Sequence, residues 1–446
     1  MTDTAAGRDG WDALLDAVED ASPVEAVEAV SRRAGLTLGA SAVSFLIADL
    51  SGRGLVRLTH VPLTDVPLTD VPLTDVPLDG QVGRDETPDG VTVERRDAQE
   101  VATSVPFDGG PAEEALRTQL VQVQPPTPRS GDALWTVFAP VTERGEALGL
   151  LEFSLPAEPD PAAVREIART AHLLGFVVVA SRRHTDLYEW GQRSTPFSLS
   201  AEVQRRLLPD AFTCEAGSFI LSAWLEPADS VGGDTFDYSL ARDVLHLSMT
   251  DAMGHGVASS LTATLCVGSL RNTRRHGVTL LEQARLVNAA LIEHGAALVT
   301  ETFSTGLLAR VDLHTGDLTM VNAGHALPYL LRSGAVDTVE LPPDLPFGLF
   351  PDTAYRSTTL RLVAGDRVVF VTDGMLERNA AFLDLPDLIA KSGSLHPREA
   401  TRVLANQVLE ASGQALADDA ALLLLDWNGN HGRGRDTTAG TATRPG

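Results

Sequence analysis

Two short strand-like segments in the second half of the chain constrain its fold more than any other feature. The segments TFDYSL (235–240) and VLHLSM (244–249) are separated only by Ala-Arg-Asp, which is typical of a turn. A hairpin centred between Arg242 and Asp243 places Asp234 directly opposite Asp251 at its open end, at a spacing of about 5 Å. Like charges at opposite positions are unfavourable unless a cation lies between them. The pattern therefore predicts a cation site at the end of this hairpin.

Other aspartates of the second half also stand at the ends of apolar strands. They are Asp237 in GGDTFD, Asp373 in FVTDGMLE, and Asp418 and Asp419 in LADDAALLLLDW. One such residue is usually a turn former. With MTDAMGHG around Asp251 there are four such motifs, and the glycine beside three of them lets the backbone approach a ligand closely. A site built only from carboxylate oxygens suits Mg²⁺ or Mn²⁺. Because no histidine or cysteine ligand is needed, the pattern argues against zinc.

Composition excludes several classes of function. The net charge of −25 disfavours nucleic acids and anionic membranes as partners, since both need clustered Lys and Arg. Lys391 is the single lysine, so neither a phosphate-binding loop of the GxxxxGK[ST] type nor a protein kinase lysine can be present. The two cysteines, Cys214 and Cys266, are expected to be buried small hydrophobes. The chain lacks an apolar run long enough for a membrane helix and a signal pattern at its start, which predicts a cytoplasmic protein.

The order of patterns predicts an α/β chain of several parts. Residues 1–182 form the first domain, with a proline-rich VPLTD repeat at 61–79 expected as a surface loop and one long helix over 161–190. A helical linker at 183–209, a second domain at 210–427 and a disordered tail at 428–446 follow. The layout of the first domain resembles a GAF domain, a sensing module. A merely structural or dimerising domain is the alternative.

The motifs of the second domain occur together in one order. They are AEVQRRLLP, GGDTFDY, MTDAMGHGVASSL, TFSTGLLARVDLHTG, LTMVNAGHALPYLL, LPFGL, GDRVVFVTDGMLE and DDAALLLL. This ordered set resembles the SpoIIE-like or RsbU-like branch of the type 2C metal-dependent protein phosphatases. The resemblance implies a four-layer α/β/β/α sandwich with the metals at one edge, between the two sheets. It also implies hydrolysis of phosphoserine or phosphothreonine with two Mn²⁺ or Mg²⁺ ions.

Carried over residue by residue, the resemblance names the site. Asp234 and Asp251 match the central metal ligands and the catalytic pair, and Ala252 matches a residue that lends its backbone carbonyl. Asp373 matches the ligand of the TDG motif, and Asp418 matches the last ligand, with Asp419 as the alternative. The sequence departs from the family pattern at Thr250 and at Ala421, and neither change removes a carboxylate.

The resemblance also implies partners. The substrate would be a phosphorylated anti-anti-sigma factor with a STAS domain, and the linker helix is a candidate surface for a homodimer and for transmitting a signal. Neither nucleic acid nor membrane is an expected partner. A catalytically silent sensor or scaffold of the same pathway is the alternative function. His325, in NAGHALP, is expected to be a packed hairpin histidine.

Overall fold

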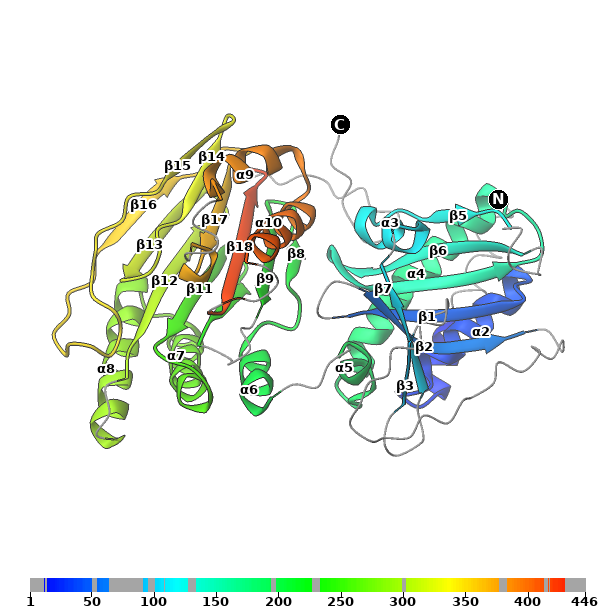
Figure 1. The fold of residues 1–446 in the computed structure, drawn as a ribbon, viewed down its shortest axis with the longest axis horizontal. Coiled ribbons are helices and arrows are strands. Elements are labelled where there is room, and N and C mark those ends of the chain that lie inside the picture. Colours follow the sequence, from blue (N-terminus) through cyan, green and yellow to red (C-terminus); the bar gives the residue numbers. More distant parts are fainter. Residues whose placement is uncertain are drawn as a thin grey trace. The chain divides into compact units, whose positions relative to one another are not determined.

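The structure is a computed structural model that describes residues 12, 14–49, 54–63, 91–94, 101–107, 109–126, 134–193, 198–226, 233–298, 302–376, 383–412, 416 and 418–429. The chain divides into two compact units, Met1–Pro196 and Phe197–Arg435, apart from short tail segments outside the described residues (Figure 1). Most of the predicted loop 61–79 and of the predicted tail 428–446 also lies outside the described residues.

The first unit is built on a seven-stranded antiparallel sheet in the order β3-β4-β2-β1-β7-β6-β5. Its elements are α2 (Ala26–Leu38), β1 (Ala42–Ala48), β2 (Gly54–Pro62), β3 (Val91–Glu94), β4 (Val101–Pro106), α3 (Pro111–Thr118), β5 (Gln122–Gln124), β6 (Trp135–Glu143), β7 (Glu146–Leu155), α4 (Pro161–Ser181) and α5 (Leu187–Gly191).

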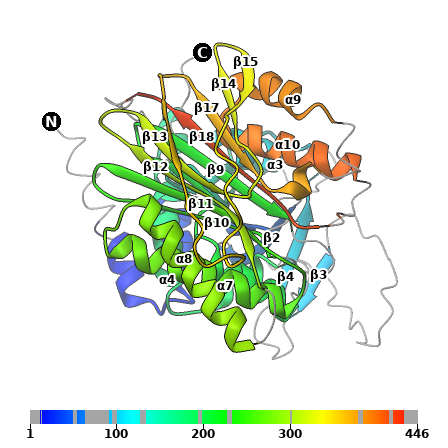
Figure 2. The same ribbon diagram turned by 90° about the vertical axis from the view of Figure 1, so that its left-hand side faces the viewer.

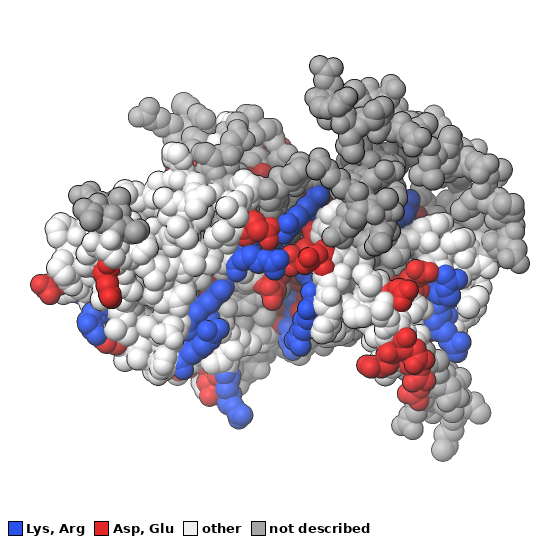
Figure 3. Space-filling view, turned by 90° about the horizontal axis from the view of Figure 1, so that it is seen from below, with Lys and Arg blue, Asp and Glu red and all other residues white. Residues whose placement is uncertain are grey.

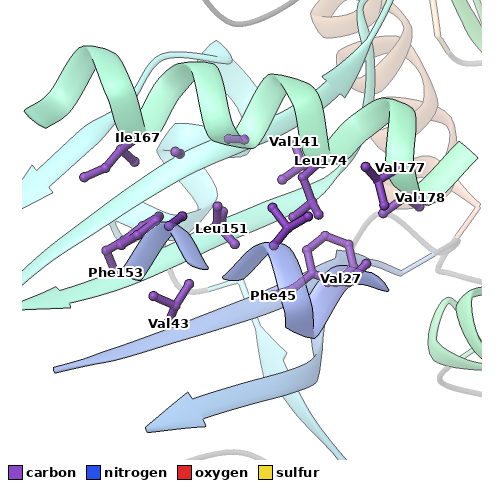
Figure 4. Packing of buried hydrophobic residues seen from close by; sticks show 14 of the residues in the cluster. Val27, Val43, Phe45, Val141, Leu151, Phe153, Ile167, Leu174, Val177 and Val178 are labelled. Atoms are coloured by element: carbon purple, nitrogen blue, oxygen red, sulfur yellow. The ribbon is translucent and has the colours of Figure 1, made fainter. Parts of the chain in front are cut away.

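The core of the first unit lies between one face of this sheet and helices α2 and α4. Figure 4 shows Ile167 and Leu174 of α4 facing Phe45 and Phe153 of the sheet, and all four side chains are fully buried. Alternate residues of a strand point to opposite faces. The other face, which includes Leu46, is therefore the one that packs against α3. The likeness to a GAF domain stays a prediction.

The prediction of a single helix over 161–190 is wrong. Helix α4 begins after Asp160, whose carboxylate accepts hydrogen bonds from the backbone N–H groups of residues 162 and 163, and it ends at Ser181. The chain then turns, and the short helix α5 begins at Leu187. Tyr188 is only 1% exposed because this turn packs it into the core of the first unit, where its hydroxyl donates to the Pro23 carbonyl at 3.3 Å. Burial of this side chain outweighs the helical periodicity.

The second unit contains two antiparallel sheets. The five-stranded sheet has the order β10-β11-β12-β13-β16 and the six-stranded sheet has the order β15-β14-β17-β18-β9-β8. The strands are β8 (Thr213–Glu215), β9 (Phe219–Glu226), β10 (Thr235–Leu240), β11 (Val244–Ala252), β12 (Ser304–Asp312), β13 (Asp317–Ala323), β14 (Tyr329–Arg332), β15 (Ala335–Thr338), β16 (Ser357–Arg361), β17 (Arg367–Val371) and β18 (Ala420–Trp427).

Helices cover the outer faces of these two sheets. Described helical elements of the unit are α6 (Leu199–Leu207), α7 (Val257–Arg275), α8 (Leu280–Leu298), α9 (Leu385–Lys391), α10 (Pro397–Ala411) and the 3₁₀ turns η1 (Asp373–Met375) and η2 (Ser392–Ser394). Helices α7 and α8 pack on the five-stranded sheet, and α9 and α10 pack on the six-stranded sheet (Figure 2). A third apolar cluster fills the space between the sheets. The layers follow the α/β/β/α order that the resemblance implies.

Three further features of the described residues bear on the predictions. No helix among them has the length and apolarity that crossing a bilayer requires. Both cysteines are free and buried, as the sequence predicts. On the face drawn in Figure 3, basic and acidic side chains lie interspersed, and many arginines of the chain form ion pairs with nearby carboxylates, as Arg356 does with Asp344 at 2.6 Å.

Candidate metal centre

The predicted hairpin is confirmed, with the predicted register. Strands β10 and β11 pair from Thr235 opposite Thr250 to Leu240 opposite Leu245. The ladder continues beyond the strand end, because the Ala252 N–H donates to the Gly233 carbonyl at 3.2 Å. This bond leaves Asp234 directly opposite Asp251, as the sequence predicts. The pair therefore occupies the open end of the hairpin.

Strand alternation directs this pair between the two sheets. Phe236, two residues after Asp234, and Met249, two residues before Asp251, both belong to the apolar cluster between the sheets. Since residues two apart on a strand share a face, both carboxylates point toward the six-stranded sheet. Asp237 lies on the opposite face.

Asp237 does not join Asp234 and Asp251 between the sheets but interacts with the outer helix α7. Arg271 and Arg274 of α7 donate to its two carboxylate oxygens at 2.9 and 2.8 Å. Asp237 is only 3% exposed, so its charge is compensated by these two guanidinium groups. The second aspartate of GGDTFD therefore anchors α7 to the sheet.

The six-stranded sheet brings its own aspartates to the same edge. Asp373 begins η1 directly after Thr372, which follows β17, and Asp419 directly precedes β18. The Thr372 N–H donates to the Ala421 carbonyl at 3.1 Å, and the Ala421 N–H donates to the Thr372 hydroxyl at 2.8 Å. These bonds fix the TDG turn against the DDA turn.

Glycine is required at two points of this edge because backbones touch there. A Cβ atom on Gly233 would collide with the Ala252 carbonyl oxygen, and one on Gly374 would collide with the Asp419 carbonyl oxygen. Each glycine neighbours one of the acidic residues, Asp234 or Asp373. The structure thus accounts for these two glycines by contact between backbone segments, whereas the sequence suggested approach to a ligand.

The electrostatics show that these carboxylates act on one another. Burial, followed by the charge of Asp251, raises the pKa of Asp234 well above its ordinary value, while a hydrogen bond from Thr372 lowers it. Burial and the charges of Asp373, Asp418 and Asp419 raise the pKa of Asp251 to about 7. Burial and the charge of Asp418 also raise the pKa of Asp373. Five aspartates thus form one repelling group.

Asp418 and Asp419 are both close enough to act on Asp251, but their surroundings differ. Asp419 is 1% exposed, whereas Asp418 is exposed and its carboxylate accepts the Asp419 N–H at 2.8 Å. The charges of Asp418 and Asp419 both raise the pKa of Asp251. The choice between them as the last ligand stays open. Ala252 lies at the end of β11, and its use as a carbonyl ligand stays a prediction.

Gln204 is a site residue that the sequence interpretation missed. Its Nε2 donates to the Asp234 carbonyl at 2.8 Å and to the Asp419 carboxylate at 2.6 Å, and the residue is only 3% exposed. It stands on α6, inside the AEVQRRLLP motif. The sequence could have indicated this residue, because Gln204 is a polar residue on the same face of the helix as Ser200 and Leu207, which are buried.

The donor set fits a divalent cation. Oδ2 of Asp234 is buried and has no hydrogen-bond partner within the described part of the chain, and a buried, unpaired carboxylate oxygen is costly unless a cation compensates it. Oxygen donors from carboxylates are those that Mg²⁺ and Mn²⁺ prefer. Across the described residues, however, no three Asp, Glu, His or Cys side chains are gathered closely enough to hold an ion as they stand.

Part of the second unit is similar to known proteins. Residues 241–428 match the family model described as Stage II sporulation protein E (SpoIIE). The phosphoserine phosphatase RsbU of Bacillus subtilis (strain 168) is 22% identical over 234 residues, which are 51% of this chain and 68% of RsbU. Protein IcfG of Synechocystis sp. is 23% identical over 204 residues, 40% of this chain but only 32% of IcfG. The chain therefore spans about a third of the length of IcfG.

One solved structure is also similar to part of this chain. The crystal structure of the RsbU and RsbW domains of Rv1364c from Mycobacterium tuberculosis is 24% identical, with a TM-score of 0.42, and the match covers 52% of this chain and 64% of that one. By this sequence match, residues 241–428 resemble the SpoIIE family of PP2C-type phosphatase domains.

Proposed function

We propose that the second unit is a metal-dependent protein phosphatase that hydrolyses phosphoserine or phosphothreonine with two Mn²⁺ or Mg²⁺ ions. The observation that carries this proposal is the opposed pair Asp234 and Asp251, directed between the sheets. One buried Asp234 oxygen has no hydrogen-bond partner among the residues that the structure describes. The match of residues 241–428 to the SpoIIE family and the similarity to RsbU support it.

The ligands in this proposal are oxygen atoms of the acidic edge. Asp234, Asp251, Asp373 and either Asp418 or Asp419 would supply carboxylates, and Ala252 its carbonyl. Bound divalent ions would supply Lewis acidity toward a water molecule and toward the phosphoryl oxygens.

The chain's own hydrogen bonds would orient these ligands. The Ser304 hydroxyl donates to the Asp251 carbonyl at 2.9 Å, and Gln204 holds the Asp419 carboxylate. The Thr372 side chain also acts on the Asp234 carboxylate and lowers its pKa. Such outer partners fix the direction of a ligand's lone pairs before an ion arrives. Neither a cysteine nor a histidine nucleophile is part of the proposal.

The proposed substrate is a phosphorylated anti-anti-sigma factor with a STAS domain, in the cytoplasm. Its support is the resemblance of the ordered motifs and the similarity to RsbU. For the first unit we propose a GAF-like sensing role, on the order of its elements. Because α4 ends at Ser181, a signal from that unit would not pass along one continuous helix, and a homodimer through the linker remains part of the proposal only.

The test uses the full chain and two substrates, a phosphoserine peptide and a phosphorylated STAS protein. Phosphate release should require Mn²⁺ or Mg²⁺, stop with EDTA and return when metal is added back. Undiminished turnover in EDTA would rule out the two-metal mechanism. Metal binding by calorimetry without any turnover on either substrate would favour the silent scaffold instead.

A further inference from the structure

The segment between β15 and β16 presents exposed apolar side chains near the acidic edge. It contains the LPFGL motif, residues 345–349, and Figure 1 shows it in yellow beside α8. Leu345, Leu349 and Phe350 are 44%, 39% and 52% exposed. Single exposed apolar residues are common on any protein surface, whereas a group of them marks an interaction site. The proposed chemistry uses none of the three.

Buried polar side chains hold this segment in place. Asn288 of α8 is only 1% exposed and uses both ends of its amide here, because Nδ2 donates to the Phe350 carbonyl and Oδ1 accepts from the Gly348 N–H, each at 2.8 Å. The Asp344 carboxylate accepts from the Arg356 guanidinium at 2.6 Å and from the Arg356 N–H at 2.7 Å. The exposed apolar side chains therefore stand on a preformed frame, which lowers the entropy cost of binding a partner.

The middle of the segment is anchored in the core. Phe347 is fully buried, and its ring lies 5.4 Å from the ring of Tyr355. Gly348 has a left-handed φ of 88°, and a Cβ atom there would collide with the Thr302 carbonyl. The backbone thus packs against the residues that precede β12. The exposure of the neighbouring apolar side chains is a property of a well-packed segment.

Ser304 connects this segment to the acidic edge. Its N–H donates to the Phe347 carbonyl and its carbonyl accepts from the Phe347 N–H, both at 2.9 Å. Its hydroxyl donates to the Asp251 carbonyl at 2.9 Å, and it pairs with Ala252 in the β11–β12 ladder. Because neighbouring strands lie about 4.8 Å apart, the Phe347 backbone is about 10 Å from that of Ala252.

Met253 adds an exposed apolar side chain on the other side of β12. It is 44% exposed and directly follows Ala252, and its N–H donates to the Phe303 carbonyl at 3.0 Å. The start of β12 therefore lies between Met253 and the segment around Phe347. We call the four exposed side chains the apolar rim, which consists of Met253, Leu345, Leu349 and Phe350.

The charges near the rim favour recognition by apolar contacts. The acidic edge consists of aspartates that repel one another, and the chain carries a net charge of −25. Neither attracts a phosphorylated partner over a distance. Arg356 is the one basic residue of segment 341–356, and it is paired with Asp344. Bound metal can hold the phosphoryl group, but the protein around that group has to be held by uncharged contacts.

We propose that the apolar rim is the docking surface for the protein substrate, a folded phosphoprotein that presents an apolar patch next to its phosphoserine or phosphothreonine. This proposal rests on the proposed phosphatase function, since the phosphoryl group has to reach the acidic edge while the rim contacts the protein that carries it. The rim contributes equally to binding before and during the reaction, so it lowers KM and leaves kcat unchanged. A short phosphopeptide that reaches only the acidic edge does not use the rim.

The test compares a phosphorylated STAS protein with a short phosphoserine peptide that contains the same phosphorylation site, using the full chain with Mn²⁺. The wild type should have a KM at least about 10-fold lower for the protein than for the peptide. Combining Leu349→Ser with Phe350→Ser should raise KM for the protein about 10-fold or more, as expected when apolar anchors of an interface are removed. The kcat on the protein, the KM for the peptide and the Mn²⁺ affinity should stay unchanged, which a general structural defect would not allow.

Leu240→Ser is the matched control. Leu240 is also an apolar residue of the second unit and is 46% exposed, but it lies at the turn end of the hairpin, opposite the end that carries Asp234 and Asp251. This variant should keep the KM for both substrates, and an effect equal to that of the double variant would contradict the assignment of the rim.

Three results would overturn the docking surface alone. They are an unchanged KM for the protein in the double variant, an equal rise of KM for the peptide, and a wild type that turns over the peptide but handles the protein no better. A wild type that turns over neither substrate with Mn²⁺ would overturn the proposed function and the docking surface with it.

Discussion

Gln204 and Asp419, 215 residues apart in the sequence, are joined by a buried hydrogen bond of 2.6 Å from the Gln204 amide to the Asp419 carboxylate. This bond ties α6, the first helix of the second unit, to the turn before β18. The same amide nitrogen also holds the Asp234 carbonyl. The position of α6 and the geometry of the acidic edge are therefore linked.

Replacing Gln204 tests that link. Gln204→Leu removes the donor at nearly constant volume and should lower the free energy of unfolding of the metal-free protein by about 1–3 kcal/mol, because a buried carboxylate loses one partner. Urea denaturation measures this loss. Gln407→Leu, which removes an exposed bond to Glu410, is the control and should change stability by less than about 0.5 kcal/mol. Equal effects of the two substitutions on stability would contradict a stabilising role for the buried hydrogen bond between Gln204 and Asp419.

The raised pKa of Asp251 predicts how stability without metal depends on pH. Its carboxyl has an ordinary value of 3.8 and a value of about 7 in the folded protein. The folded state therefore binds this proton more tightly than the unfolded state, so the stabilising contribution is complete below pH 3.8 and is lost as pH rises to about 7. The melting temperature in EDTA should fall by several degrees between these limits. In Asp251→Asn the fall in melting temperature should be smaller. A pH profile identical to that of the wild type would show that Asp251 is not the cause of the fall.

The two aspartates of GGDTFD should behave differently when neutralised. Asp237→Asn weakens the pairs with Arg271 and Arg274 and should destabilise the fold by about 2 kcal/mol or more, while Mn²⁺ binding persists in the folded protein. Asp234→Asn should do the reverse, sparing metal-free stability and losing Mn²⁺ binding. Calorimetry and urea denaturation of both variants separate these roles. If only the folded Asp237→Asn variant lost Mn²⁺ affinity, Asp237 and not Asp234 would be the metal ligand, which would contradict this account.

The close approach at the TDG turn gives a further prediction. Gly374→Ala places a methyl group against the Asp419 carbonyl and should destabilise the protein by about 1–3 kcal/mol through overpacking. Gly268, inside α7, has open space around its Cβ position. Gly268→Ala should therefore be neutral or stabilise by up to about 1 kcal/mol. Thermal melting of the two variants is the measurement, and a Gly374→Ala protein as stable as Gly268→Ala would argue against the contact.

Local patterns in the sequence were sufficient for the hairpin. The register follows from the length of the turn at Arg242 and Asp243, and a change of one residue would have sent Asp234 to the opposite face. The glycines beside Asp234 and Asp373 were interpreted as allowing close approach of a ligand, whereas the structure shows close contacts between backbone segments there.

Tertiary contacts decided what the sequence left unresolved. The end of α4 at Ser181 depends on the burial of Tyr188, and the role of Gln204 depends on residues 30 and 215 positions away. Helical periodicity contains neither kind of information.

The central claim is that Asp234 and Asp251 face each other in order to hold metal, and Asp251→Asn tests it most directly. Thermal melting of the wild type and the variant, each with and without Mn²⁺, should be measured alongside phosphate release. The variant loses one repelling charge with almost no change of shape, so it should melt at or slightly above the wild type without metal. It should also lose most of the Mn²⁺-induced shift and nearly all turnover. A variant that keeps wild-type turnover and the full Mn²⁺-induced shift would contradict the ligand assignment.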